Sequence, residues 1–301
     1  MRRTKTVALC TVALVFINTA CQQEPHNSTG VGEDGSDELS VASRVVTLSP
    51  HLAELMFAAD AGDKLVGISA YTDFPAEAAG LPIISDAFMV DQEQLALLKP
   101  DLLLAWSNGT PTHVIDQLRA AGFRVEAINT DGLDDVATAL ELIGQLTGNL
   151  NPARDAAANY RRQMKALADR YSGAQQVDVF YQVASRPLYT VNGTHYISEL
   201  LSMCGGRNIF DDLGELAPMV DVEAVVSRNP EAMLAAKDST QAAFDVWDRF
   251  PDLAANQYGN RFFMPAAEIG RATPRLVEAG AAVCEALENA RRNKQAYAEP
   301  R

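Results

Sequence analysis

The sequence predicts an α/β protein with two Rossmann-like lobes, each built on a mostly parallel sheet, joined by a single long backbone α-helix. Three observations support this class. Short apolar runs alternate with amphipathic stretches twice along the chain, which is the order expected of a parallel sheet with crossover helices. One uninterrupted helical pattern separates the two series. Two segments, one from each series, resemble each other at a constant offset.

The first series begins at Arg44 and defines an N-terminal lobe over residues 44–150. Its apolar, β-type runs predict strands at 44–49, 64–69, 81–84, 101–106 and 124–128. Helical patterns fill the intervals at 51–59, 91–98, 111–121 and 133–147.

The second series begins with "VDVFYQV" and defines a C-terminal lobe over residues 173–290. Its predicted strands are 177–183, 231–235 and 261–264, and its predicted helices are 196–203, 221–227 and 273–290. We expect residues 291–301 to form a tail.

The helix between the lobes is predicted at residues 151–172. Asn151 suits the N-cap and Pro152 the first helical position. Apolar residues then recur every three or four positions, at Ala153, Ala156, Tyr160, Met164, Leu167 and Tyr171. A helix of about twenty residues spans roughly 30 Å. A single such connection predicts a stiff hinge with modest closure.

An internal repeat supports two related lobes. "DQEQLALLKPDLLLAW" starts at Asp91 and "DVEAVVSRNPEAMLAA" starts at Asp221, an offset of 130 residues. Both indicate a helix, a turn marked by proline and a buried strand. The matching pairs are Asp91/Asp221, Glu93/Glu223, Pro100/Pro230, Asp101/Glu231, Leu104/Leu234 and Ala105/Ala235. The copies differ at their last residue, which is Trp106 in the first and Ala236 in the second.

The N-terminus has the plan of a secretory signal peptide over residues 1–20. Basic residues precede an apolar run of about eleven residues, which is too short to span a bilayer. Cys21 follows a small residue, as in a bacterial lipobox, so we expect lipid attachment there. Asn18 departs from the usual leucine of that motif, and plain secretion is the alternative. Gln22 would favour outer-membrane sorting in a Gram-negative cell.

Residues 21–43 are acidic and rich in glycine and serine, which predicts a flexible tether. The whole chain carries a formal charge of −14. Loss of the three basic residues of the signal peptide leaves 22 basic and 39 acidic residues, a net charge of −17. This balance argues against nucleic-acid binding, which would need a basic face.

Two cysteines remain in the exported chain. Cys10 leaves with the signal peptide and Cys21 takes the lipid, so Cys204 and Cys284 are left. Pairing is the default in an oxidising compartment. Two separately buried thiols are the alternative.

The sequence contains no motif of a known catalytic class. Gly-x-Ser-x-Gly, phosphate-binding glycine loops and His-Glu-x-x-His are all absent. We therefore expect neither an enzyme nor a resident metal or cofactor. A metal-dependent envelope enzyme using His51, His113 and His195 is the remote alternative.

Candidate ligand-binding residues lie just after the predicted strands. In open α/β sheets, ligands bind outside the carboxyl ends of the strands. The candidates of the first lobe are Ser49, Pro50, His51, Tyr71, Asp73, Phe88, Trp106, Ser107 and Asn108, and those of the second are Tyr181, Tyr189 and Arg271. The set is rich in aromatic and hydrogen-bonding groups and poor in acid–base pairs. It is typical of a site that holds a broad amphipathic ligand, although each aromatic alone could equally belong to the core.

Several segments resemble the cobalamin-binding proteins of bacterial ABC importers. They are "RVVTLSPHLAELMFAADAGDKLVGISAYTDFP", "LALLKPDLLLAW", "DQLRAAGFRVEAI", "ISELLSMCGGRNIFDDL" and "IGRATPRLVEAGAAVCEAL". The resemblance covers residues 44–290 and extends to the wider class III, helical-backbone periplasmic binding proteins for haem and siderophores. It implies a monomeric, non-enzymatic protein that captures a corrinoid between its lobes and delivers it to an ABC permease.

The resemblance also assigns residues. It implies that Trp106 and Tyr71 line the corrinoid pocket, that Arg271 lies near it, and that Cys204 and Cys284 form a disulfide. A glutamate on each lobe would dock on the permease. Glu223 matches the second-lobe glutamate, whereas the chain has Thr112 at the first-lobe position, with Glu93 and Asp116 as nearby substitutes.

Three pocket tryptophans of the family are replaced. The replacements fall at about Ala87, next to Phe88, at Ala217, and near Glu268. A different ligand, haem or a ferric siderophore, is therefore the alternative. His51 or a tyrosine would then be its axial ligand. We expect a corrinoid, because the first lobe is closer to the cobalamin binders.

Overall fold

The computed structural model describes residues 40–86, 89–237 and 242–299. The predicted signal peptide, the lipidation site Cys21, most of the tether and the candidate Phe88 lie outside these residues. The fold begins earlier than expected, because Ala42 is buried and its N–H donates to the Leu146 carbonyl at 2.7 Å. The segment before Arg44 therefore packs on the first lobe instead of belonging to the tether.

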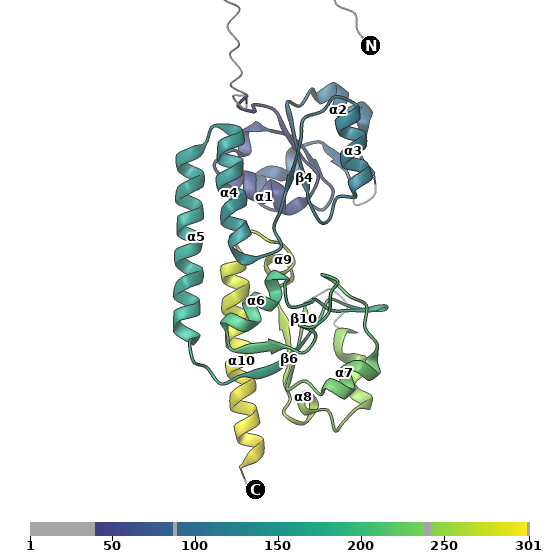
Figure 1. Ribbon diagram of the computed structural model, residues 1–301, viewed down its shortest axis with the longest axis vertical. Helices are drawn as coiled ribbons and strands as arrows, with labels where there is room; N and C mark the ends of the chain where they lie inside the picture. Colours follow the sequence, from purple (N-terminus) through teal and green to yellow (C-terminus); the bar gives the residue numbers. More distant parts are fainter. Residues whose placement is uncertain (1–39, 87–88, 238–241, 300–301) are drawn as a thin grey trace, which may run out of the picture. The chain divides into compact units, whose positions relative to one another are not determined.

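Five parallel strands form the sheet of the first lobe, in the order β3-β2-β1-β4-β5. Figure 1 shows helices on both sides of this sheet. They are β1 (Val45–Thr47), β2 (Leu65–Ser69), β3 (Ile83–Ser85), β4 (Leu102–Trp106) and β5 (Val125–Ile128). The helices are α1 (Pro50–Ala58), η1 (Gly62–Lys64), η2 (Ala76–Gly80), α2 (Gln92–Leu98), α3 (Thr112–Ala120) and α4 (Leu133–Thr147). The predicted strands and α-helices of this lobe are confirmed, with ends that move by at most two residues.

Both faces of this sheet are covered by helices. Val45 and Leu104 pack with α1 and α4 on one face. Val46, Leu103 and Ala105 pack with α2 and α3 on the other face. Because alternate side chains enter two apolar layers, the strands are almost continuously apolar in sequence.

Four parallel strands form the sheet of the second lobe, in the order β11-β10-β6-β9, and β7 and β8 form a separate hairpin. The strands are β6 (Val177–Gln182), β7 (Ala184–Ser185), β8 (Leu188–Tyr189), β9 (Gly206–Asn208), β10 (Ala232–Ala236) and β11 (Arg261–Met264). The helices are α6 (Tyr196–Met203), α7 (Val222–Arg228), η3 (Ala242–Arg249), α8 (Ala254–Gln257) and α9 (Ala266–Ile269). Strands β7, β8 and β9 were not predicted from the sequence, because they are too short to show the alternation of apolar and polar residues that is typical of a strand.

The connecting helix α5 (Leu150–Tyr171) starts slightly before its predicted position. Asn149, rather than Asn151, is the N-cap, so Pro152 lies within the first turn. Proline is tolerated there because the N–H groups of the first turn have no intrahelical partner. Among the described residues, no helix is both long and apolar enough to cross a membrane.

The closing helix α10 (Leu276–Ala298) continues through the predicted tail. Its later turns are tied to the second lobe by Arg291, which is buried. The guanidinium donates to the carbonyls of Gln175 at 2.6 Å and Cys204 at 2.7 Å. The prediction of a tail was therefore wrong, because a charged residue at this position serves as a buried donor.

The repeat is present in three dimensions. Asp91 caps α2 by accepting from the Gln94 N–H at 2.9 Å, and Asp221 caps α7 by accepting from the Ala224 N–H at 2.6 Å. The helices end at Lys99 and at its counterpart Asn229, both left-handed with φ of 48° and 45°. A buried strand follows in each lobe.

One hydrophobic core runs through both lobes. It includes Leu55 and Leu140 of the first lobe, Ala157 of α5, and Leu201 and Val283 of the second lobe. The lobes are therefore joined by more than the single helix that the sequence predicted. Within this core, Cys204 and Cys284 are paired and link the end of α6 to α10, with their Cα atoms 4.8 Å apart.

Candidate ligand-binding site

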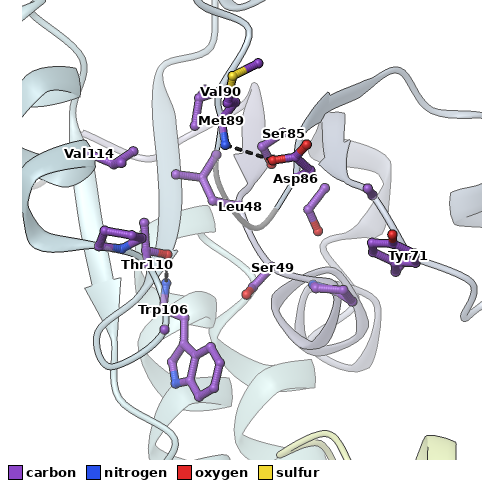
Figure 2. Close-up of a pocket in the computed structure, with 15 residues that line it drawn as sticks. Leu48, Ser49, Tyr71, Ser85, Asp86, Met89, Val90, Trp106, Thr110 and Val114 are labelled. Carbon is purple, nitrogen blue, oxygen red and sulfur yellow. Dashed lines mark hydrogen bonds between the residues drawn. The ribbon is translucent and has the colours of Figure 1, made fainter.

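A pocket of about 160 Å³ opens where β1 to β4 of the first lobe end. This is the edge at which open parallel sheets bind ligands. Figure 2 shows Trp106 and Tyr71 on either side of Ser49. The wall includes Leu48, Ser49, Pro50, Tyr71, Met89, Trp106 and Val114. Four predicted residues, Ser49, Pro50, Tyr71 and Trp106, therefore meet here.

A tight turn holds Trp106 half-buried at the end of β4. Its backbone N–H donates to the Thr110 hydroxyl at 3.1 Å, and the Thr110 N–H donates back to the Trp106 carbonyl at 2.9 Å. Gly109 lies against the ring so closely that a Cβ there would be 1.7 Å from the indole Cε3. The indole Nε1 is buried and has no hydrogen-bond partner among the described residues. The turn therefore fixes which part of the ring reaches the pocket.

His51 lies behind Trp106 and not in the pocket wall. It belongs to α1, is buried, and packs edge-on against the indole with ring centroids 5.2 Å apart. Its Nε2 is 3.4 Å from the Thr130 hydroxyl. Burial, followed by the positive charge of Arg271, lowers the pKa of His51 to about 4. His51 is thus a neutral support for Trp106 in place of the predicted ligand contact.

Tyr71 is the most exposed aromatic residue of the pocket wall, with 82% of its surface accessible. Its backbone is left-handed, with φ of 65°. Arg271 of the second lobe donates to its carbonyl at 2.9 Å and also pairs with Asp73. The hydrogen bond from Arg271 lowers the pKa of Asp73. Asp73 and Arg271 thus bind each other, and neither lines the pocket.

A second pocket, of about 660 Å³, opens at the carboxyl ends of β6 and β10. Its wall includes the polar side chains Gln182, Ser185, Arg186, Asp245 and Arg249. Two guanidinium groups against one carboxylate make this pocket more basic than the strongly acidic chain around it.

Two predicted residues of the second lobe lie elsewhere. Tyr181 is 3% exposed and faces the shared core, because alternate residues of β6 point to opposite faces. Its neighbour Gln182 therefore faces the other way and reaches the pocket. Tyr189 lies in the hairpin, where its backbone bridges to Met219, and is not part of the pocket wall.

Ser107 and Asn108 point to the loop after β5. The Ser107 hydroxyl donates to the Asn129 side-chain oxygen at 3.4 Å, and the Asn108 amide donates to Asp131. Burial raises the pKa of Asp131 despite this bond. These residues tie the Trp106 turn to its neighbouring loop and do not line the pocket.

The family model for periplasmic binding proteins matches residues 45–264, which span both sheets. This chain belongs to the periplasmic binding protein family. Members of this family are substrate-binding proteins and not enzymes.

Named relatives of this periplasmic binding protein share most of its length. The vitamin B12-binding protein of Vibrio parahaemolyticus is 31% identical over 253 residues, covering 83% of this chain and 91% of the relative. The crystal structure of the periplasmic vitamin B12 binding protein of Vibrio cholerae superposes with a TM-score of 0.77 at 32% identity, covering 83% of this chain and 98% of that one. A periplasmic heme binding protein from Pseudomonas aeruginosa, at 23% identity, a TM-score of 0.72 and coverage of 82% and 92%, shares the fold.

The candidate docking carboxylates of this periplasmic binding protein are all exposed. Glu93 and Glu223 are the second residues of α2 and α7, so they hold equivalent positions in the two copies of the repeat. Asp116 lies in the middle of α3, and Thr112 begins that helix. The geometry therefore makes Glu93 the counterpart of Glu223.

The three histidines that the structure describes lie in different elements of the fold. His51 is buried, His113 is exposed on α3, and His195 caps α6 by accepting the Ile197 N–H on Nδ1 at 3.1 Å. Within residues 40–86, 89–237 and 242–299, no three His, Cys, Asp or Glu side chains are grouped to hold a metal ion.

Several residues of the site were not among the sequence candidates. Met89, Val114, Arg186 and Arg249 line the two pockets, and Gly109, Glu54 and Arg275 support the first of them. Glu54 contained a signal, because it is an acid within the apolar stretch "HLAELMFAA" and is buried in α1. A buried carboxylate requires a cationic partner, although the sequence does not say which residue provides it.

Proposed function

We propose that this protein captures a corrinoid of the cobalamin type between its two lobes and delivers it to an ABC permease. The observation that carries the proposal is the pocket at the edge of the first sheet, with half-buried Trp106 and exposed Tyr71 in its wall. Relatives named for vitamin B12 binding, which align over 83% of the chain, support this ligand class.

The two pockets suit the two kinds of surface that a cobalamin offers. Its corrin ring has broad apolar faces, which match Trp106, Met89 and Val114. Its rim carries amides and its nucleotide loop a phosphodiester. Arginine is well suited to phosphate oxygens, so Arg186 and Arg249 are the proposed partners of that group.

Calorimetric titration with cyanocobalamin tests the proposal. We expect one site per chain, and we expect Trp106→Ala to weaken binding by about 1–3 kcal/mol, as for an aromatic hot spot. Tyr297→Ala removes an exposed aromatic of α10 and should leave affinity unchanged. Absence of binding at about 10–100 μM, the level of a weak complex, would refute the corrinoid assignment.

Glu93 and Glu223 are the proposed docking carboxylates for arginines of the permease. Their equivalent positions in the repeat suit a partner with two similar halves. We expect Glu93→Lys and Glu223→Lys to abolish ligand-stimulated ATP hydrolysis by the reconstituted transporter without changing cyanocobalamin affinity. Asp116→Lys serves as the control. Loss of stimulation in Asp116→Lys alone would move the first-lobe contact to α3.

Haem is the second candidate ligand, favoured by one observation. Tyr71 is exposed and free to act as an axial ligand, whereas His51 is buried behind Trp106. Titration with hemin would then produce a Soret band that Tyr71→Phe abolishes. A spectrum unchanged from free hemin would exclude this ligand.

Export and lipid attachment at Cys21 complete the proposal, with Cys204 and Cys284 oxidised and the protein acting as a monomer. In bacterial cells, the wild-type chain should incorporate labelled palmitate, whereas the Cys21→Ser variant should not. The variant should instead be released in soluble form. Label in Cys21→Ser would contradict the proposed site.

A further inference from the structure

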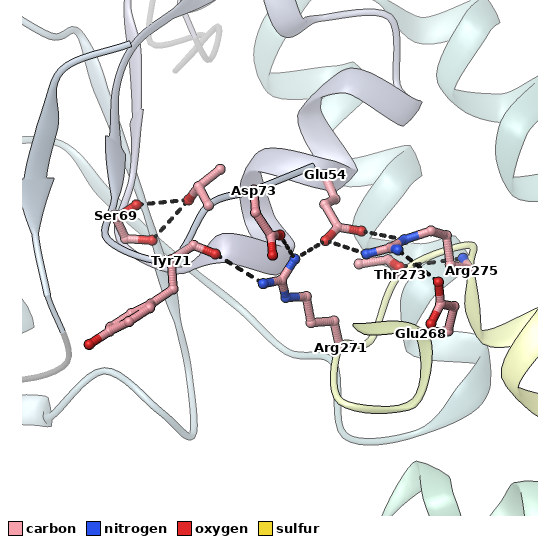
Figure 3. A network of polar contacts seen from close by, with 9 residues as sticks. Glu54, Ser69, Tyr71, Asp73, Glu268, Arg271, Thr273 and Arg275 are labelled. Carbon is pink, nitrogen blue, oxygen red and sulfur yellow. Dashed lines mark hydrogen bonds and ion pairs between the residues drawn. The ribbon is translucent and has the colours of Figure 1, made fainter. Parts of the chain in front are cut away.

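Glu54 is a carboxylate buried between the two lobes. It lies on α1, and its side chain is 2% exposed. Figure 3 shows Arg271 and Arg275 of the second lobe reaching it. Arg271 Nη1 donates to Oε1 at 2.7 Å, and Arg275 donates to Oε1 at 2.9 Å and to Oε2 at 3.1 Å. Both oxygens of a first-lobe carboxylate are therefore bound by the second lobe.

The same two arginines hold the segment 71–74 of the first lobe. Arg271 donates to the Tyr71 carbonyl at 2.9 Å and pairs with the Asp73 carboxylate. The Arg275 guanidinium lies over the Phe74 ring, 4.3 Å from its centroid. This short loop is thus tied to the second lobe at three of its four residues, Tyr71, Asp73 and Phe74.

The charges in this cluster depend on one another. A buried carboxylate that loses its partner is strongly destabilising. Burial acts to lower the pKa of Arg271, but the hydrogen bonds that Arg271 donates to Asp73 and Glu54 outweigh it and raise that pKa. Glu268 adds a third carboxylate, which binds Arg275 at 3.2 Å. Three carboxylates, Glu54, Asp73 and Glu268, therefore share two guanidinium groups.

The held loop carries the exposed aromatic of the pocket. Tyr71 has a φ of 65°, which non-glycine residues rarely adopt and which needs support from its surroundings. Arg271 supplies that support through the Tyr71 carbonyl. Arg271 itself is absent from the walls of both pockets.

We propose that Glu54, Arg271 and Arg275 form a brace between the lobes that positions Tyr71 for the ligand. Glu54 orients Arg271, and Arg271 fixes the Tyr71 backbone, so both are positioning residues that do not touch the ligand. The proposal rests on the proposed function only for the identity of the ligand.

Hydrogen–deuterium exchange of the ligand-free protein tests the brace directly. Glu54→Gln keeps the side-chain shape and removes the charge. We expect exchange at residues 71–74 to accelerate and the cyanocobalamin Kd to rise, each by about tenfold, as when contacting partners are uncoupled. Asp178→Asn is the matched control, because it breaks the 2.7 Å pair with Arg207 inside the second lobe. It should change neither quantity.

A double-mutant cycle separates positioning from a general loss of stability. In a Tyr71→Ala background, Glu54→Gln should add little further loss of affinity, since its effect passes through Tyr71. Equal losses in both backgrounds, or unchanged exchange at 71–74, would overturn the brace. Arg271→Gln, at a side chain that is 17% exposed against 2% for Glu54, should behave alike if Glu54→Gln does not fold. Failure of the wild-type protein to bind cyanocobalamin would refute the proposed function, while the exchange experiment still decides the brace.

Discussion

Gly109 determines the orientation of the Trp106 side chain, because the Gly109 backbone lies against the indole ring. A methyl group at position 109 would lie 1.7 Å from the indole Cε3, so the ring has to move. We expect Gly109→Ala to change the near-ultraviolet dichroism of Trp106 and to lower stability by about 1–3 kcal/mol, as for an overpacked site. Gly80→Ala, with no atom within 4 Å, is the control. Unchanged dichroism in Gly109→Ala would contradict this contact.

One buried histidine, His51, and one half-buried histidine, His195, make the fold less stable in mild acid. Burial lowers the pKa of His51 and of His195 to about 4, with Arg271 adding to the effect at His51. In the unfolded chain each histidine titrates near 6.5. Between these values the unfolded state binds more protons, so stability is complete above about pH 6.5 and falls until about pH 4. At pH 5 each histidine accounts for a loss of about 2 kcal/mol.

His195→Asn separates the two contributions. Asparagine can still accept the Ile197 N–H as an N-cap but does not titrate in this range. Urea unfolding at pH 7.5 and pH 5 should show a pH-dependent loss about 2 kcal/mol smaller than in the wild type. A loss equal to that of the wild type would show that His195 does not contribute.

The site residues show how far sequence alone could reach. Trp106 and Tyr71 line a pocket at the expected edge of the sheet, because the end of a strand is visible in the pattern and the edge of a parallel sheet binds ligands. Their contact with a ligand stays a prediction. The prediction for Tyr181 was wrong because its side chain points into the core. Alternate residues of a strand point to opposite faces of the sheet, so an error of one residue in register exchanges the two faces. Glu54 and Arg271 are 217 residues apart in the sequence, and no local pattern connects them.

At the scale of an element, long periodic segments were predicted well and short or irregular ones were not. Helix α4 has the predicted bounds, since its apolar stripe is clear over four turns. Strand β9 has only three residues, and it is a strand because it pairs with β6, which is distant in the sequence. A local pattern therefore could not predict it. The end of α10 was missed because residues 291–295 are all polar and interrupt the apolar period of the helix.

The end of α10 also supports a prediction. A chain that stops after Ala290 loses Arg291, which leaves the carbonyls of Gln175 and Cys204 without their donor. The bond to Cys204 is buried and the bond to Gln175 is partly buried. At about 1–3 kcal/mol each, we expect urea unfolding to report a total loss of about 2–6 kcal/mol. A chain that stops after Ala298 keeps the helix and should match the full chain. Equal stability of both truncated chains would restore the interpretation of a tail.

At the scale of the whole molecule, the shared core limits how far the lobes can move. Apolar packing continues from α1 and α4 through α5 to α6 and α10. The brace adds ionic contacts between Glu54 of the first lobe and Arg271 and Arg275 of the second. Such packing opposes a wide hinge motion, because opening would expose apolar surface. Capture of ligand in this protein should therefore involve small adjustments at the pocket walls.

The pair Cys204–Cys284 lies in the part of that core that belongs to the second lobe. Removing it destabilises the second lobe directly, and the response of the first lobe then shows how strongly the two lobes are coupled. The pair closes a loop of 80 residues that contains most of the second sheet. Replacing both cysteines by serine should cost about 3–5 kcal/mol in the chain-entropy account. Because the core is continuous, we expect a single unfolding transition at lower urea, detected equally by far-ultraviolet dichroism and by Trp106 fluorescence in a Trp247→Phe background. Two separate transitions would mean that the lobes unfold independently and that the shared core couples them only weakly.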